Sequence, residues 1–356
     1  MRTLGGPMRV AAVRTVVPEH HYDQDQITRA VVRRTDAREE LVRRFHAATQ
    51  VTGRNLALPI DEYVKLEGFT GANDVYIETA VELATRAVGD ALDRAGCAPH
   101  DVDHLIFCSS TGVATPSLDA RVAQRAGLRE DVTRVPMFGL GCAAGAAGLS
   151  RLHDFLRGWP ERVAVLVCVE LCSLTVQRED TSVANLVASG LFGDGAAAVV
   201  ALGDRRDTGG HQGPRVVASR SRLYPGTARL MGWDVGDHGL RVVLAADLVG
   251  HVEATLAGDV TAFLGDHGLS PNRVGSWVCH PGGPKVIETI QRELGLEPGA
   301  LDITWNSLRT MGNLSSVSVL NVLEETIAQR RPPDGEPGLL MALGPGFSAE
   351  LVLLRW

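Results

Sequence analysis

The stretch VPMFGLGCAAGAAGLSRL, residues 135–152, constrains the fold more than any other part of the chain. An apolar run ends in Gly139-Leu140-Gly141, a lone Cys142 follows, and a run of alanine and glycine opens an amphipathic helix. The glycines permit a tight turn from strand to helix. The turn places Cys142 at a helix N-terminus, where free N–H groups and the helix dipole favour a thiolate. A lone cysteine is more commonly a buried structural residue, and the interpretation of Cys142 as a nucleophile depends on two segments further along the chain.

Two segments near the C-terminus present polar side chains in a similar way. Residues 276–279 indicate a short buried strand, which His280 closes before a Pro-Gly-Gly-Pro break and a helix starting near Lys285. Asn313 lies between a glycine and two serines, at a position typical of a helix N-cap. A cysteine, a histidine and an asparagine, each displayed at a turn, match a nucleophile, a base and an orienting donor.

With these motifs the chain resembles a type III polyketide synthase, of the chalcone synthase-like branch of the thiolase superfamily. The motifs are GLGCAAGAAGL around Cys142, LFGDGAAAVV at 191–200, HPGGPKV at 280–286, GNLSS at 312–316 and GPGFSAE at 344–350. They occur in the family's order and spacing and span most of the chain. The resemblance implies a catalytic triad of Cys142, His280 and Asn313. It also implies that Phe192 is the gatekeeper between a CoA tunnel and the reaction cavity.

The resemblance implies a Claisen condensation in which Cys142 is loaded from an acyl-CoA starter and the chain is extended with malonyl-CoA. The helix dipole and His280, as imidazolium, would stabilise the thiolate. His280 and Asn313 would donate to the enolate oxygen formed on decarboxylation. Phe192 would help to exclude water. This chemistry requires no metal and no redox cofactor.

Product choice is expected in the cavity wall. Thr111 and Cys172 together resemble the bacterial alkylpyrone synthases, and Val242 replaces an aromatic residue of the plant enzymes. These positions favour an aliphatic starter and an alkylpyrone or alkylresorcinol product. Ser110, where tetrahydroxynaphthalene synthases tend to carry cysteine, argues against a starter derived from malonyl-CoA alone.

Three further positions are assigned by the resemblance. Thr115 aligns with a residue that reaches into the partner's cavity in a homodimer. Ser315 is expected among the substrate-binding residues. Arg44 aligns with a cationic residue that contacts CoA phosphates.

Other interpretations of the function are also compatible with the sequence. The enzyme could use malonyl-CoA only, or an aromatic starter. A single-condensation enzyme like ketoacyl-ACP synthase III also uses Cys, His and Asn, but that family carries an HQAN-type motif where this chain has HPGG. A catalytically silent paralogue acting as a binding partner is the remaining class, and the intact Cys142, His280 and Asn313 argue against it.

Composition fits a globular enzyme acting on small molecules. The chain is 45% hydrophobic and 22% charged, and its net charge of -7 gives no basis for nonspecific nucleic-acid binding. The six cysteines form no CxxC pair, and several lie in apolar runs, which predicts reduced thiols in a cytoplasmic protein. The N-terminus makes a poor signal peptide, and no apolar run approaches the roughly 18 residues of a membrane span.

Alternating apolar patterns predict an α/β fold. We expect helices over 75–95 and 248–265, and strands over 8–17, 102–109, 162–169, 192–202, 339–343 and 349–354. Residues 203–215 are polar and glycine-rich, as in a linker. The resemblance implies a five-layered αβαβα fold of two duplicated βαβαβ halves. The N-terminal half, 1–208, would carry Cys142, and the C-terminal half, 209–356, would carry His280 and Asn313.

Overall fold

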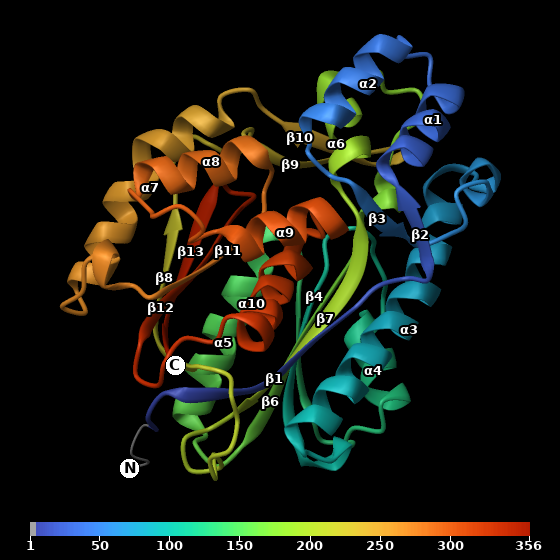
Figure 1. The fold of residues 1–356 in the computed structure, drawn as a ribbon. Coiled ribbons are helices and arrows are strands. Elements are labelled where there is room, and N and C mark those ends of the chain that lie inside the picture. Colours follow the sequence, from blue (N-terminus) through green and yellow to red (C-terminus); the bar gives the residue numbers. More distant parts are fainter. Residues whose placement is uncertain (1–4) are drawn as a thin grey trace.

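The computed structural model describes residues 5–356, and nine strands form one mixed sheet through the middle of the molecule (Figure 1). In sheet order the strands are β11 (Ser276–Cys279), β12 (Pro337–Gly344), β13 (Ser348–Arg355), β8 (Arg215–Leu223), β1 (Met8–Val16), β7 (Asp194–Leu202), β6 (Val163–Leu171), β4 (Val102–Cys108) and β5 (Thr133–Met137).

The sheet consists of two halves that meet at a short junction. β1 and β8 pair only through Met8 with Val216 and Arg9 with Arg215, whereas β1 and β7 pair along most of their length. On the N-terminal side β4 is parallel to β5 and β6, and on the C-terminal side β11 is parallel to β12. The order of the strands therefore separates the sheet into an N-terminal and a C-terminal part.

Helices cover both parts and also fill the space between them. α3 (Gly68–Ala95) and α4 (Leu118–Arg125) pack on the outer face of the N-terminal strands, and α7 (Leu248–Gly265) and α8 (Pro284–Glu293) pack on the C-terminal strands. α5 (Ala144–Gly158) and α10 (Ser318–Gln329) share one core with strands of both parts (Figure 1). The result is the expected five-layered αβαβα arrangement.

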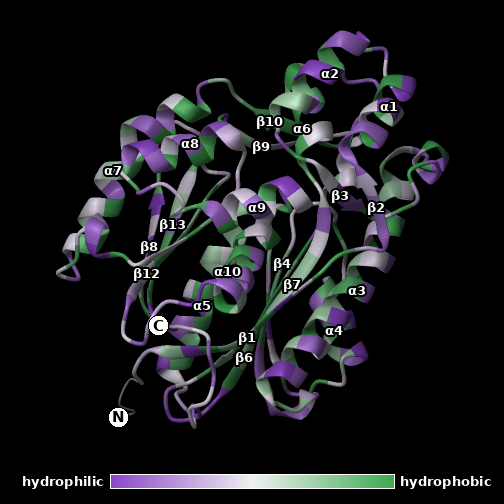
Figure 2. Ribbon diagram, viewed as in Figure 1, coloured by the Kyte–Doolittle hydropathy of each residue, from purple (hydrophilic) through white to green (hydrophobic). Residues whose placement is uncertain are grey.

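The small residues of α5 are needed in this central layer. A side chain at Gly145 would place its Cβ 2.4 Å from the carbonyl oxygen of Ser316, and one at Gly148 would come 2.4 Å from Leu166. Figure 2 shows hydrophobic residues along the central strands and hydrophilic residues over the outer helices. Close packing of α5 therefore fixes the position of the turn that precedes it.

The remaining elements frame one end of the sheet. They are α1 (Gln24–Arg34), α2 (Glu39–Ala48), α6 (Val183–Leu191), α9 (Asp302–Met311) and two hairpins, β2 (His20–Asp23) with β3 (Gly53–Leu56) and β9 (Met231–Gly236) with β10 (Gly239–Leu244). The sequence patterns did not predict these elements. Among the predicted ones, α7 has the expected bounds, whereas α3 begins at Gly68 rather than at residue 75.

The polar segment 203–214 connects β7 to β8 without regular secondary structure, as predicted. Across residues 5–356, no helix combines the length and the apolar character that a membrane span requires.

Candidate active site

Cys142 lies in a 3₁₀ turn, Gly141–Ala143, that leads directly into α5. The predicted strand–turn–helix setting is therefore confirmed. Gly139 and Gly141 both have positive φ angles, 91° and 45°, which favour glycine. A Cβ at Gly141 would also lie 2.9 Å from the ring of Pro345, in the loop between β12 and β13. That loop thus packs against the turn and holds the sulfur in place.

The side chain of Cys142 is 5% exposed, and its sulfur lies 3.7 Å from the hydroxyl oxygen of Ser315. Burial raises the pKa of Cys142 to about 12. Hydrogen bonding with Ser315 and Asn313 acts in the opposite direction, and the negative charge of Glu170 adds to the increase. Burial therefore favours the neutral thiol of Cys142.

Asn313 joins the Cys142 turn to Phe192 and to the loop that follows His280. It forms a β-bridge with Phe192, and its Nδ2 donates to the carbonyl oxygen of Gly282 at 3.4 Å. Its Oδ1 accepts from the backbone N–H of Ser315 at 2.7 Å. Asn313 therefore organises the turn before α10.

The N-cap interpretation of Asn313 needs one correction. The N-cap of α10 is Val317, four residues further along the chain, because the 3₁₀ turn Ser315–Val317 precedes the helix. The side-chain oxygen of Asn313 is used by that turn and not by α10 itself.

His280 follows β11, as predicted, and its backbone N–H donates to the carbonyl oxygen of Met341 at 2.9 Å. The side chain is 4% exposed, and neither ring nitrogen has a hydrogen-bond partner among residues 5–356. Burial lowers the pKa of His280 to about 3. The sequence led us to expect an imidazolium beside a thiolate, but burial of both groups favours the neutral imidazole and thiol.

Glu170 is a buried carboxylate that the sequence analysis missed. It lies at the end of β6 and is fully buried, and burial raises its pKa. It accepts hydrogen bonds from the hydroxyls of Ser110, Ser315 and Ser316 at 3.2, 3.3 and 2.7 Å. A single acid inside the apolar run VAVLVCVEL was the signal that could have identified it.

The other predicted wall residues fall into two groups. The first group is buried close to Glu170 and consists of Ser110, Thr111 and Cys172. The backbone N–H of Ser110 donates to the carboxylate of Glu170 at 3.0 Å. The hydroxyl of Thr111 accepts from the backbone N–H of Leu171, the residue after Glu170, at 2.9 Å. Burial, followed by the charge of Glu170, raises the pKa of Cys172. These three residues therefore belong to the surroundings of Cys142.

Val242, Thr115 and Arg44 lie elsewhere. Val242 is half-buried on β10, opposite Trp233 of β9. Thr115 is exposed on the loop before α4. Arg44 is exposed on α2, with its guanidinium 4.9 Å from the ring centre of Phe45. The structure thus does not join these three side chains to the Cys142 site within one protomer.

No group of three or more His, Cys, Asp or Glu side chains with the geometry of a metal site occurs in residues 5–356. The buried polar groups gathered around the Cys142 turn are the thiol of Cys142, the amide of Asn313 and the carboxyl of Glu170, and the imidazole of His280 is buried at the end of β11.

Comparison with known proteins gives a consistent result along the whole chain. Residues 2–205 match the family model of the N-terminal domain of chalcone and stilbene synthases, and residues 215–356 match that of the C-terminal domain. A 1,3,6,8-tetrahydroxynaphthalene synthase of Streptomyces peucetius subsp. caesius is 52% identical over 98% of this chain and 93% of its own. An alpha-pyrone synthesis polyketide synthase-like protein of Mycobacterium tuberculosis is 31% identical, over 88% of this chain and 82% of its own.

Solved structures agree with this result. The crystal structure of the 1,3,6,8-tetrahydroxynaphthalene synthase of Streptomyces coelicolor, a bacterial type III polyketide synthase, superposes with a TM-score of 0.92 at 31% sequence identity. The match covers 98% of this chain and 99% of that one.

Proposed function

The chain belongs to the chalcone and stilbene synthase family and is a type III polyketide synthase, and we propose that Cys142 carries its growing acyl chain. As a member of this family it is an acyltransferase that condenses CoA thioesters iteratively and cyclises the product. The position of Cys142 supports the assignment, because its turn is fixed by α5 on one side and by Pro345 on the other. Proximity to Ser315 and Asn313 supplies the polar contacts that a reacting sulfur needs.

His280 and Asn313 would donate hydrogen bonds to the malonyl thioester. Both ring nitrogens of His280 are buried without a partner in the described part of the chain, and an unused buried donor is costly unless a substrate satisfies it. One N–H of the neutral imidazole and the amide of Asn313 would donate to the enolate oxygen formed when carbon dioxide leaves. On loading, the thiol proton of Cys142 would pass to His280 as the sulfur attacks the starter thioester, and CoA would depart as its thiol after taking that proton back from His280.

Malonyl-CoA is the starter that we propose, as well as the extender. The relative that is 52% identical is named for 1,3,6,8-tetrahydroxynaphthalene, a naphthalene without an alkyl chain. The hydroxyls of Ser110 and Ser315 and the carboxyl of Glu170 make the surroundings of Cys142 polar. This proposal differs from the sequence analysis, in which Cys172, Thr111 and Val242 favoured an aliphatic starter. An aliphatic starter is therefore the second candidate.

A homodimer is part of the proposal. β5 is the edge strand of the nine-stranded sheet, and most of its residues are exposed. Val135 of β5 and Phe138 directly after it are 40% and 58% exposed, which is the kind of surface that a second copy covers. Val113, on the loop after β4, is 45% exposed. Thr115, on the loop that follows Val113, would then reach the partner's cavity.

Three smaller assignments complete the proposal. Arg44 would contact CoA phosphates from the exposed face of α2. The two halves would divide at residues 208 and 209. The six cysteines are all free, which supports a location in the reducing cytoplasm.

The experiment is incubation of the purified enzyme with malonyl-CoA alone, followed by mass spectrometry of the products. We expect a compound with the mass of tetrahydroxynaphthalene. A parallel series adds acyl-CoA starters of increasing chain length. Products that form only in the series, and not from malonyl-CoA alone, would establish the aliphatic starter instead.

A further inference from the structure

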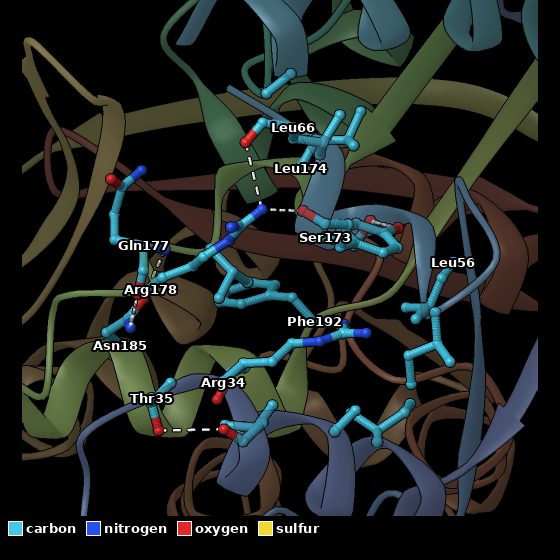
Figure 3. A pocket seen from close by; sticks show the side chains of 18 of the residues that line it. Arg34, Thr35, Leu56, Leu66, Ser173, Leu174, Gln177, Arg178, Asn185 and Phe192 are labelled. Atoms are coloured by element: carbon cyan, nitrogen blue, oxygen red, sulfur yellow. Dashed lines mark hydrogen bonds between the residues drawn. The ribbon is translucent and has the colours of Figure 1, made fainter. Parts of the chain in front are cut away.

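A cavity of about 320 Å³ lies beside the proposed catalytic site (Figure 3). Its wall comes from α1, from residues 54–72, from the segment that follows Cys172 and from α6. Phe192 is the single proposed site residue that lines it. The cavity thus lies next to the catalytic site but does not include Cys142, His280 or Asn313.

The wall of this cavity is positively charged in a protein of negative net charge. Arg34, Arg54 and Arg178 line it together with one acidic residue, Glu179, so the lining carries an excess of two positive charges (three minus one). The whole chain has a net charge of -7. The positive charge is therefore a local feature of the cavity.

Two of the three arginine side chains are not fully buried: Arg34 is half-buried and Arg178 is exposed. Arg34 pairs with Asp61 at 3.2 Å, but the Asp61 side chain is 85% exposed, so the pair is weak. Arg178 donates to the carbonyl oxygens of Tyr63 and Leu66 and forms no ion pair with any residue from 5 to 356. In Figure 3 these side chains enter from two walls, Arg34 from the end of α1 and Arg178 from the segment after Cys172.

The two guanidiniums also repel each other. Burial lowers the pKa of Arg34, the negative charge of Asp61 acts in the opposite direction, and the positive charges of Arg33 and Arg178 make smaller contributions that lower it. An anion placed between Arg34 and Arg178 would relieve the repulsion. Arg54 differs from both, because it is 1% exposed and donates to the carbonyl oxygens of Ser189 and Gly190.

The rest of the wall is largely apolar. The aliphatic side chains that line it belong to Ile27, Val31, Leu56, Leu174 and Val176. A concave site of a few hundred Å³ with apolar walls and a few charged groups is typical of a small-molecule site. Its ligand would combine an apolar body with one anionic group.

We propose that this cavity binds an amphiphilic monocarboxylate, with the carboxylate between Arg34 and Arg178 and the apolar body along Ile27 and Leu56 towards Phe192. Guanidinium groups bind carboxylates through paired N–H donors, which gives the head group its place. The aliphatic wall excludes water from the body of the ligand. The inference concerns binding and is separate from the proposed condensation at Cys142.

The test is calorimetric titration of the full-length enzyme with decanoate, and with decanol as the uncharged probe of equal length. We expect decanoate to bind at one site per chain and about tenfold more tightly than decanol, the scale of one hydrogen bond to a charged group. Arg178→Gln and Arg34→Gln should each weaken decanoate about tenfold and leave decanol unchanged. Arg33→Gln is the matched control, because Arg33 is exposed and does not line the cavity.

Two further titrations identify the site. Enzyme alkylated at Cys142 should bind decanoate as well as the untreated enzyme, and inorganic phosphate should not compete. Equal binding of decanol and decanoate, or an effect of Arg33→Gln as large as that of Arg178→Gln, would overturn the proposal. So would loss of binding after alkylation, which would place decanoate in the catalytic cavity. Because no turnover is measured, failure here leaves the proposed polyketide synthesis untouched.

Discussion

The turn that holds Cys142 and the turn that holds His280 differ in how far the protein satisfies their side chains. The sulfur of Cys142 has the Ser315 hydroxyl beside it, and Pro345 packs against its turn. The ring of His280 is equally buried, but both of its nitrogens lack a partner among residues 5–356. The fold therefore holds the proposed nucleophile in place by itself, whereas the proposed role of His280 needs a substrate atom to accept its hydrogen bond.

Apart from the loss of Cys142 itself, the largest effect is expected for His280. His280→Ala should reduce malonyl-CoA decarboxylation by about 10²–10³, the scale of one oxyanion donor. The folded protein should remain intact, since the ring forms no hydrogen bond with any residue that the structure describes. His280→Gln, which retains an N–H donor, should recover part of the rate. If the alanine variant decarboxylates at the normal rate, the histidine does not serve the substrate.

The same variant should alter the dependence of stability on pH. The pKa of His280 is about 3 in the folded protein against an ordinary value of 6.5, so below pH 6.5 the unfolded chain binds a proton that the folded chain does not. The native protein therefore loses stability as the pH falls from 6.5 towards 3. His280→Ala should remove up to about 1.4 kcal/mol of this loss per pH unit. Urea unfolding at a series of pH values measures it.

Glu170→Gln should change the pKa and the alkylation rate of Cys142. The carboxylate charge raises the pKa of Cys142, so its removal should lower that pKa and speed alkylation of the thiol. The loss of the charged acceptor for Ser110, Ser315 and Ser316 should cost about 1–3 kcal/mol of stability. Alkylation slower than in the wild type would contradict this account of Glu170.

Ser315→Ala should have a smaller effect of the opposite sign. Hydrogen bonding with Ser315 is the strongest influence that lowers the pKa of Cys142, so its loss should raise that pKa and slow alkylation at fixed pH. Ser150→Ala is the control, because Ser150 is a buried serine of α5 whose hydroxyl donates to the carbonyl oxygen of Ala146. Equal rates of Cys142 alkylation in the Ser315 and Ser150 variants would show that Ser315 does not influence the pKa of Cys142.

The smallest effect is expected at Arg44, outside both turns. Exposed charges contribute about 0–1 kcal/mol, so Arg44→Gln should raise KM for malonyl-CoA a few-fold and leave kcat unchanged. Arg43→Gln, an exposed neighbour on α2 that pairs with Glu39, is the control. A fall in kcat rather than a rise in KM would show that Arg44 does not act through CoA.

The sequence predicted the backbone of both turns better than their electrostatics. Glycines around Cys142 and the break after His280 are local signals, and the structure places both turns as expected. The neutral states of Cys142 and His280 follow from burial by segments distant in sequence, which local patterns do not contain. Glu170 itself stands out as a single acid in an apolar run, but its serine partners lie 60 and 145 residues away along the chain, so its hydrogen bonds could not be predicted.

The measurement that tests the central claim most directly is the intact mass of the enzyme after brief exposure to malonyl-CoA, followed by peptide mapping. We expect an acyl adduct on Cys142 in the wild type, and neither adduct nor product from Cys142→Ala. Alanine suits this helix start, so that variant should fold normally. An adduct on Cys172 or Cys279, or polyketide formation by Cys142→Ala, would contradict the account.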